Sequence, residues 1–526
     1  MLTEIRVGGF KSFSSVQHAQ LAPITLIFGP NSSGKSSLIQ ALLLLKQSVA
    51  ATRSSINVLD FNGHLVDLGD YKNAVHRHTE RPIEFGISYK TDFIRRPTNY
   101  LLPPTESERS VDLLFSSLTE DIWTTQSRKR SRRYIGLEKC TYRIGGSTGP
   151  ASNKAFKFTV QNADAEAREF GLRYRRGREH HFFRAAEIGE LDQVAGYLTQ
   201  FFNADLQQVE PEAPAQRSTQ GTSTRKKAIK DLLVTSLFST NDFLPSALHR
   251  PPRAKEGSEQ GSDDLNNQYL VDSYGFRTDF LSRFADEVRL LFDQISYIGP
   301  FRRPPDRIEI LRDRTTDTVG RAGEYFHYVL YEKDKRSLML NRWLKKLNIP
   351  YTLELMHADL QDRSAIAGKV VQINYRDNRF NTNVSSTDIG FGIGQIIPIV
   401  VEGMLSENKI IMIEQPELHL HPKLQADIAD LIVETSYSAE NPTGNQWIIE
   451  SHSELILLRL LRRVREGKLP HTSIRVLYVD PPSSANPGTP ASQIFDLEID
   501  RDGRFLVPWP NGFFDEQGAE IFSGSK

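Results

Sequence analysis

The sequence has little cysteine, no excess charge of either sign and no long apolar run, and each shortage excludes something. Cys140 is the one cysteine among 526 residues, which excludes an internal disulfide and fits a reducing cytoplasm. Lys and Arg together number 65, as do Asp and Glu, which excludes a uniformly basic nucleic-acid-binding surface but leaves room for a local basic groove. The longest apolar run, ALLLL at 41–45, is too short to cross a bilayer. We therefore expect a cytoplasmic protein without membrane contact, and the opening MLTEIRVGGFKSF lacks the apolar core of a secretory signal.

The chain also lacks internal repeats and sustained heptads, so we predict no long coiled-coil arm. Its length is more than one core usually organises, which favours two or three domains. Strand-like and helix-like segments alternate in 1–90 and again in 290–526, a pattern typical of an α/β sheet. The expected strands include ITLIF, IEFGISY, KIIMIE, QWIIESH and IRVLYVD, and the expected helices include SSLIQALLLLKQSVA, FGIGQIIPIVVEGML and PKLQADIADLIVETS.

Residues 91–289 differ in composition from the rest of the chain. We predict that they form an insertion, either α/β or mainly helical, in a head built from 1–90 and 290–526. Basic runs occur at 128–133 and 173–178, and polar Pro/Gly/Ser-rich stretches at 211–227 and 251–268 predict flexible loops. One helix is predicted from an apolar face that contains Leu281, Phe284, Val288, Leu291, Phe292 and Ile295. Each basic run is either a nucleic-acid contact or a solvated face, and the partner of the insertion, whether DNA, RNA or protein, stays open.

The segment GPNSSGKS at 29–36 matches the phosphate-loop pattern G-x-x-x-x-G-K-[ST]. It follows the strand-like run ITLIF and opens a helix, which is the setting that the pattern requires. The backbone N–H groups of such a loop and the helix N-terminus bind phosphate. Lys35 is expected to reach the β- and γ-phosphates of ATP, and the Ser36 hydroxyl to bind Mg²⁺. The predicted nucleotide-binding residues are Gly29, Pro30, Asn31, Ser32, Ser33, Gly34, Lys35, Ser36 and Ser37.

A second group of motifs comes late in the chain. In KIIMIEQPELHLHP at 409–422, a buried strand ends in Glu414, which is the place where phosphate-binding folds often hold their metal ion. DIGFGIGQ at 388–395 places a glycine-rich turn at a helix start, a second anion-binding device that we expect to serve the phosphates of another subunit. ESHSE at 450–454 places His452 at a strand end, within reach of the γ-phosphate.

Together GPNSSGKSS, DIGFGIGQ, IEQPELHLHP and ESHSE resemble the ABC-type ATPase heads of the RecF and overcoming-lysogenisation-defect group. Among these they are most similar to short-armed ATPases of phage-defence operons, the Septu ATPases. The stretches FNGHLVDLGDY, YIGPFRRPP and PWPNGFFDE agree with that subgroup, and the resemblance covers 1–90 and 290–526. It implies a P-loop ATPase of the α/β class that uses ATP and Mg²⁺ and assembles as a head-to-tail dimer or a higher even-numbered oligomer.

The resemblance also implies residue roles. Ser36 and Glu414 would form the metal site, His452 would be the switch histidine, and Gly390, Gly392 and Gly394 would form a signature loop offered to the partner's ATP. The transporter form of that loop, Leu-Ser-Gly-Gly-Gln, is absent here. Most heads have a second carboxylate after the metal acid, and here that position is Gln415. An amide cannot take a proton but can position water, so we expect real but slow hydrolysis.

Several residues carry two interpretations. Glu417 is either a general base or a cap of the helix that begins near Pro422, with the cap slightly favoured. His419 and His421 are at metal-ligand spacing but lack an evident third ligand, which favours a loop at a dimer interface. Arg302 and Arg303 either reach the nucleotide or the partner subunit, or lie in a solvated turn. We expect Trp509, Phe513 and Phe514 to form a docked C-terminal edge rather than a ligand site.

Three functions follow from these features. The first is an ATPase switch that senses or regulates a separate effector in antiviral defence, with an HNH-type nuclease as the expected partner because this sequence shows no nuclease constellation. The second is a RecF-like DNA-binding repair ATPase. The third is a nucleotide-bound scaffold that does not hydrolyse ATP, an alternative that Gln415 keeps open.

Overall fold

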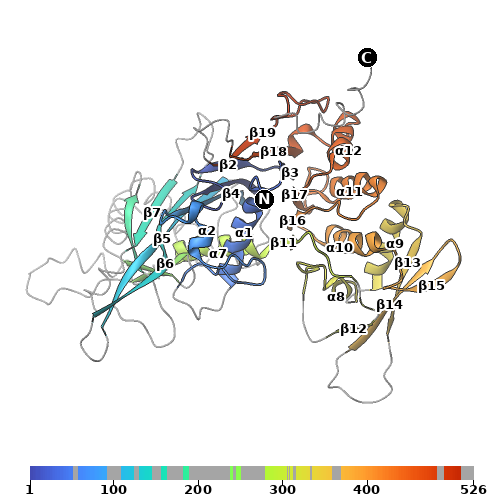
Figure 1. Cartoon of the computed structure of the whole chain (residues 1–526), viewed down its shortest axis with the longest axis horizontal. Helices are drawn as coiled ribbons and strands as arrows, with labels where there is room; N and C mark the ends of the chain where they lie inside the picture. The colour runs from blue at the N-terminus through green and yellow to red at the C-terminus, as the bar shows by residue number, and fades with distance from the viewer. Residues whose placement is uncertain are drawn as a thin grey trace, which may run out of the picture. The chain divides into compact units, whose positions relative to one another are not determined.

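The computed structural model describes most of the N- and C-terminal parts of the chain and a smaller share of its middle (Figure 1). The described residues are 1–50, 57–91, 108–123, 129–144, 156–162, 182–188, 237–240, 244–249, 279–304, 306, 308–311, 316–331, 334–357, 369–482 and 491–510. The chain forms two compact units. The first comprises Met1, His18–Ile39 and Gln294–Lys526, and the second comprises Leu2–Gln17 and Gln40–Asp293. Residues 40–90, which we expected in the head, thus belong to the second unit.

The centre of the first unit is a six-stranded sheet in the order β11-β16-β17-β3-β18-β19. All strands except the edge strand β19 run parallel. Their bounds are β3 Ile24–Phe28, β11 Ile295–Ile298, β16 Ile410–Glu414, β17 Gln446–Glu450, β18 Ile474–Asp480 and β19 Gln493–Asp496. Every residue of β3, β11, β16 and β17 is buried, as expected for continuous Ile-rich runs in a parallel sheet covered on both faces.

Helices and a smaller sheet complete the first unit. The sheet contains β12 Ile308–Leu311, β13 Tyr351–His357, β14 Lys369–Asp377 and β15 Thr382–Ser385. The helical segments are α8 Phe326–Tyr331, α9 Asp334–Lys346, α10 Phe391–Leu405, α11 Pro422–Thr435, α12 Glu454–Arg465 and the short η3 His471–Ser473. Helix α1, Lys35–Ala50, begins in this unit directly after the phosphate loop. Helices α10, α11 and α12 lie side by side next to the parallel sheet (Figure 1).

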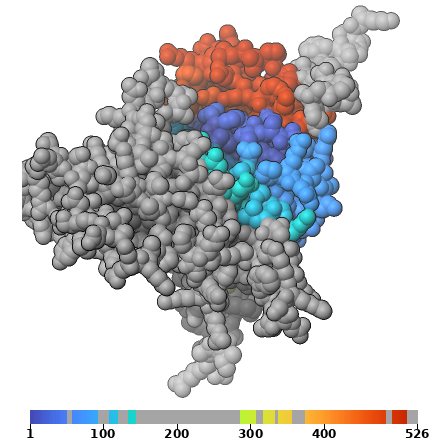
Figure 2. Space-filling model, turned by 90° about the vertical axis from the view of Figure 1, so that its left-hand side faces the viewer, coloured from blue at the N-terminus to red at the C-terminus, as the bar shows by residue number. Residues whose placement is uncertain are grey.

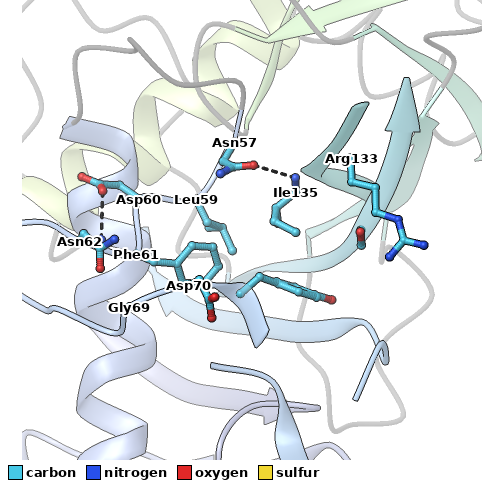
Figure 3. Close-up of a pocket in the computed structure, with 11 residues that line it drawn as sticks. Asn57, Leu59, Asp60, Phe61, Asn62, Gly69, Asp70, Arg133 and Ile135 are labelled. Atoms are coloured by element: carbon cyan, nitrogen blue, oxygen red, sulfur yellow. Dashed lines mark hydrogen bonds between the residues drawn. The ribbon is translucent and has the colours of Figure 1, made fainter. Parts of the chain in front are cut away.

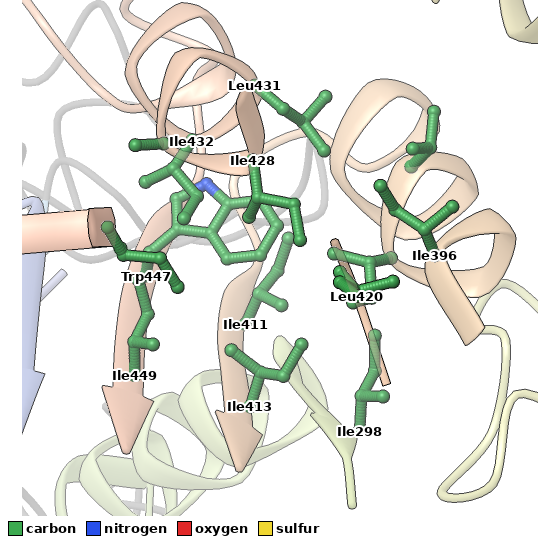
Figure 4. Packing of buried hydrophobic residues seen from close by; sticks show 14 of the residues in the cluster. Ile298, Ile396, Ile411, Ile413, Leu420, Ile428, Leu431, Ile432, Trp447 and Ile449 are labelled. Atoms are coloured by element: carbon green, nitrogen blue, oxygen red, sulfur yellow. The ribbon is translucent and has the colours of Figure 1, made fainter. Parts of the chain in front are cut away.

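Trp447 lies at the middle of the core of this unit (Figure 4). Its indole is fully buried against the side chains that α11 presents, and its Nε1–H donates to Thr435 Oγ1 at 3.2 Å. A Cβ on Gly403 of α10 would lie 2.9 Å from the indole ring. Gly403 therefore allows α10 to approach Trp447 closely. This contact packs the helix against the parallel sheet.

The second unit is built on eight antiparallel strands in the order β10-β9-β8-β7-β6-β5-β4-β1. The strands are β1 Leu2–Gly8, β4 Ile83–Lys90, β5 Glu108–Trp123, β6 Lys129–Ile144, β7 Phe156–Asn162, β8 Phe182–Ile188, β9 Leu237–Thr240 and β10 Pro245–His249. The short strand β2, Gln17–Gln20, belongs to the first unit except for Gln17. The helical segments are α2 Tyr71–Ala74, η1 His76–His78 and α7 Asp279–Asp293. Figure 2 shows the face on which residues of the 57–91 segment, in blue, adjoin β5 and β6, in cyan.

The predicted helix around Leu281 is confirmed as α7, but it ends at Asp293, and Ile295 belongs to β11 instead. Within the described residues of 91–289, the elements other than α7 are strands, which favours the α/β alternative over the mainly helical one. The predicted flexible loops at 211–227 and 251–268 lie outside the described residues.

Candidate functional site

The predicted site residues of the first unit gather where its parallel strands end. In the strand register Glu414 lies opposite Glu450, and Glu450 lies opposite Ile27 of β3. Because the carboxyl ends of parallel strands share one edge, the phosphate loop after β3 and these two acids lie at the same edge of the sheet. Open α/β sheets bind ligands at this edge.

The phosphate loop has the backbone that its glycines require. Gly29 has φ +146° and Gly34 has φ +107°, in the region that favours glycine. A Cβ on Gly29 would lie 2.3 Å from the carbonyl oxygen of Val479. Asn31 and Ser32 are exposed, whereas Ser33, Lys35 and Ser37 are buried. Helix α1 begins at Lys35, so its free N–H groups face the loop as predicted.

The ammonium group of Lys35 folds back onto the loop. Its Nζ donates to the carbonyl oxygens of Gly29 at 3.0 Å and Pro30 at 2.7 Å. Burial lowers the pKa of Lys35, and the charge of Glu450 partly opposes that effect. The amine is thus already held inside the loop in which phosphates would bind.

Glu450, at the end of β17, is a site residue that the sequence reasoning missed. It is 4% exposed, and its Oε1 accepts a hydrogen bond from Ser36 Oγ at 3.1 Å. Burial, reinforced by the charge of Glu414, raises the pKa of Glu450 to about 7. The same signal that identified Glu414, an acid that closes a buried strand, was present in QWIIE but was passed over in favour of His452.

Glu414 is oriented by β11 and by the turn after it. Its Oε1 accepts from Tyr297 Oη at 2.8 Å, and burial together with this carboxylate raises the pKa of Tyr297. Arg302 donates to the carbonyl oxygens of Glu414 at 3.0 Å and Gln415 at 3.1 Å. Arg302 is only 4% exposed, so the solvated-turn interpretation is wrong for it. The solvated-turn interpretation does fit Arg303, because Arg303 is exposed and pairs with Asp306.

Gln415 directly follows β16 with φ +47°, and its N–H donates to the carbonyl oxygen of Glu450 at 2.7 Å. Its side chain is half-buried. The backbone at this position is therefore tied to the neighbouring strand end.

Glu417 is not the cap of α11, and that interpretation is corrected here. The N-cap is His421, whose ring accepts from the Lys423 N–H at 3.3 Å. Glu417 instead accepts from Ser451 Oγ at 2.9 Å and from the His452 N–H at 2.7 Å. Both of its oxygens thus hold the turn that carries the predicted switch histidine.

His452 is half-buried, and burial lowers its pKa, with the positive charge of Lys35 adding to the effect. The electrostatic influence of Lys35 is consistent with the predicted position of the imidazole near the phosphate loop. Ser453, the next residue, caps α12 by accepting from the Ile456 N–H at 3.3 Å.

The glycine-rich turn begins α10 as predicted, with Gly390 at the N-cap. Its three glycines differ in surroundings. Gly390 is exposed, and a Cβ there would meet nothing closer than 4.0 Å, whereas a Cβ on Gly392 would lie 2.6 Å from the carbonyl oxygen of His419. Gly394 is buried within the helix. Gly390 is therefore the glycine through which this turn can be probed without disturbing the packing of the head.

Some of the remaining predicted residues lie within the described part of the chain and others lie outside it. Trp509 packs edge-on against Phe28, Tyr478 and Phe505, which places it in a docked edge, while Phe513 and Phe514 lie outside the described residues. The basic run 173–178 and Arg128 also lie outside them. Arg133, from the other basic run, is exposed and pairs with Glu80 at 3.0 Å. Among the described residues no group of three metal-ligating side chains exists, so the pair His419 and His421 gains no third ligand.

The second unit contains a separate cavity of about 450 Å³ (Figure 3). Its wall comes from the FNGHLVDLGDY stretch and from β5 and β6, and it includes Asp60, Asp70, Tyr71 and Arg133. None of the nucleotide-site residues described above lines it. No described helix is long and apolar enough to span a membrane.

A match to a protein-family model supports the ATPase assignment. The family model described as AAA ATPase domain matches residues 1–175 and 334–457. A comparison with curated proteins gave no match. Among solved structures, an SMC head bound to the C-winged helix domain of ScpA is 10% identical over 95% of this chain and 98% of its own, with a TM-score of 0.37. The SMC head domain from Thermotoga maritima is 12% identical over 95% and 99%, with a TM-score of 0.32.

Proposed function

Because the chain belongs to the family of AAA ATPase domains, we propose that it is an ATP-dependent switch whose two heads pair head-to-tail around two ATP–Mg²⁺ and so control a separate effector. The observation that carries the proposal is the convergence of the phosphate loop, Glu414, Glu450 and His452 at one sheet edge. Slow hydrolysis of ATP would reset the switch.

The residues at this edge fit a magnesium nucleotide. Gly29 lies so close to the carbonyl oxygen of Val479 that a Cβ would not fit there, and Ser33 Oγ is buried without a partner among the described residues. Lys35 would turn from the loop carbonyls to the phosphates, and Ser36 and Glu414 would hold Mg²⁺, which neutralises phosphate charge when bound. Gln415 would orient the attacking water, and His452 would hydrogen-bond the γ-phosphate.

Pairing with a second copy is supported by what the head leaves exposed. Gly390 stands open at the N-terminus of a 15-residue helix, where free N–H groups favour an anion. Phe391, beside it, is 51% exposed, and Phe301, in the turn after β11, is 83% exposed. A second subunit that covered this turn would remove such phenylalanine rings from water. We propose that this surface receives the nucleotide-bound face of the second subunit.

The effector we propose is an HNH-type nuclease, and the purpose is phage restriction. The support is the motif resemblance to Septu ATPases. The scaffold alternative keeps one observation in its favour, namely the amide of Gln415 at the position of the usual carboxylate.

Pairing is tested by measuring the mass of the full-length protein in solution with and without ATP and Mg²⁺. Gly390→Glu should abolish ATP-driven pairing because its carboxylate would meet the partner's phosphates, while ATP binding to the single head stays intact. Gly390→Gln is the matched control. Glutamine has the size of glutamate without its charge, so this variant should pair more readily than Gly390→Glu. If Gly390→Glu pairs as well as the parent, the glycine turn does not face a partner's nucleotide. If the parent protein does not dimerise in the presence of ATP and Mg²⁺, the proposed ATP-dependent switch is refuted.

A further inference from the structure

Gln415 has a backbone conformation that its surroundings have to maintain. Its φ of +47° lies in the left-handed region, which few residues other than glycine, asparagine and aspartate adopt. A residue in this conformation is under strain, and the conformation persists where neighbouring groups hold it, often at a functional site. Because Gln415 is the residue that would orient the attacking water, the groups that hold its backbone bear directly on turnover.

The backbone of Gln415 is held from both sides of β16. Its N–H donates to the carbonyl oxygen of Glu450 at 2.7 Å. Its carbonyl oxygen accepts from Arg302 Nη2 at 3.1 Å, and the same nitrogen donates to the carbonyl oxygen of Glu414 at 3.0 Å. Glu450 ends β17 on one side of β16, whereas Arg302 lies in the turn after β11 on the other side. Arg302 is thus the side chain that fixes the carbonyl group of Gln415.

The turn that carries Arg302 is itself fixed by two other segments. The carbonyl oxygen of Arg302 accepts from Gln395 Nε2 at 3.1 Å, and Gln395 is buried in α10, the helix that begins after Gly390. The next residue, Arg303, donates its N–H to the carbonyl oxygen of Ala322 at 2.8 Å. The guanidinium group is therefore presented to the end of β16 from a backbone that α10 holds in place.

Packing alone does not account for an arginine at this position. Arg302 is 4% exposed, and its Nε and Nη1 are buried without a hydrogen-bond partner in the part of the chain that the structure describes. Burial lowers the pKa of Arg302 to about 10, and the charge of Glu417 opposes that effect, so the group is charged at neutral pH. A buried cation with unpaired nitrogens lowers stability, whereas an apolar side chain would fill the same space without that cost.

We propose that Arg302 is a positioning residue for ATP hydrolysis, which holds Gln415 in its left-handed conformation so that the amide can meet the attacking water. Arg302 acts through Gln415 and not through the phosphates. Without the guanidinium group, the backbone of Gln415 relaxes toward an unstrained conformation and the amide is displaced from the water. This inference rests on the proposed function, in which Gln415 orients that water.

The first test separates turnover from nucleotide binding. The kcat and the KM for ATP of the full-length protein are measured with radiolabelled ATP, which detects slow hydrolysis. Arg302→Lys keeps the charge but loses the planar fork, and it should lower kcat by about 10- to 100-fold, the scale on which small misplacements act. Its KM should stay within about threefold of the parent's. The matched control is Arg303→Lys, at the neighbouring exposed arginine, which should keep kcat within about twofold.

The second test is a double-mutant cycle with Gln415→Ala, which removes the amide. If Arg302 acts through Gln415, the double variant should hydrolyse ATP no more slowly than Gln415→Ala alone, because the two changes remove the same contribution. A structural role of Arg302 would instead make the two losses multiply, and that result would overturn the proposal. A raised KM with unchanged kcat in Arg302→Lys would also overturn it, since the guanidinium would then contact the nucleotide.

The outcomes distinguish this inference from the proposed function. A parent that hydrolyses no ATP contradicts the function itself, whereas parental turnover with unchanged kcat in Arg302→Lys overturns the role of Arg302 alone. Should Arg302→Lys fail to fold, Gln395→Met removes the donor that holds the Arg302 carbonyl and keeps a side chain of similar length. This variant should lower kcat by about threefold to tenfold and show the same non-additivity with Gln415→Ala. Unchanged kcat in Gln395→Met would then overturn the proposal.

Discussion

Substitution of Glu417 tests how the turn that carries His452 is held in place. Its Oε2 accepts from Ser451 Oγ at 2.9 Å and its Oε1 from the His452 N–H at 2.7 Å. Glu417→Ala removes both acceptors and leaves two donors without partners, one of them on the fully buried Ser451. At about 1–3 kcal/mol for each unsatisfied donor, we expect the free energy of unfolding to fall by about 2–5 kcal/mol.

Glu417→Gln separates this anchoring role from general-base catalysis. The amide keeps the size of the side chain and one acceptor oxygen, but it turns an N–H₂ group toward the other donor. We expect a smaller loss, about 1–3 kcal/mol, with ATP turnover reduced but still measurable. Unfolding in urea and steady-state phosphate release at saturating ATP are measured on the same preparations.

The control is Glu440→Gln, an exposed acid in the turn before β17, which should stay within about 0.5 kcal/mol of the parent. If Glu417 were a general base, its substitution by glutamine would affect turnover and leave the free energy of unfolding unchanged. Unaltered stability together with complete loss of turnover in Glu417→Gln would refute the anchoring role and assign the proton transfer to Glu417.

Three further predictions concern stability and turnover. Glu287→Gln breaks the buried ion pair between Glu287 and Arg109 and should cost about 3–5 kcal/mol in urea unfolding, whereas the exposed Glu84→Gln should be neutral; a loss below about 1 kcal/mol would contradict this. Burial lowers the pKa of His327 to about 4 from 6.5, so the unfolded chain binds more protons between these values and stability falls as pH drops through them. The parent should lose about 2 kcal/mol more than His327→Gln between pH 7 and 5, and equal losses would refute the assignment. Gln415→Glu should raise ATP turnover at least about tenfold because a carboxylate can accept the proton of the attacking water, and unchanged phosphate release would show that position 415 does not meet that water.

The nucleotide-binding core was predictable because its elements carry their signals locally. FGIGQIIPIVVEGML is the whole of α10, and IIMIE and QWIIE are the strands β16 and β17. Such segments are apolar and short, and they are bounded by glycine, proline or an acid, so local sequence suffices to identify them. The partners of these elements are long-range, however, and pairings such as Ser36 with Glu450 exist only once the sheet is assembled.

The second unit was less predictable for a physical reason. Its longest described strands pair with each other and carry many charged residues, as in KRSRRYIGLEKCTYRI of β6. A run such as RKRSRR is conspicuous as a basic cluster, which hides the strand that contains most of it. Antiparallel strands are specified by cross-strand pairs rather than by local apolar content, so one strand read alone predicts little.

The glutamine at 415 can be understood from the acids around it. Glu414, Glu417 and Glu450 come together at one edge, and each has a different partner: Tyr297, the Ser451–His452 turn, and Ser36. Their mutual repulsion already contributes to raising the pKa of Glu450. A fourth carboxylate at 415 would add another like charge in the absence of a cation and would favour protonation of its neighbours. An amide avoids that crowding and keeps the ability to orient water, at the expense of a strong base, which is the compromise expected of a switch whose ATP-bound state has to persist.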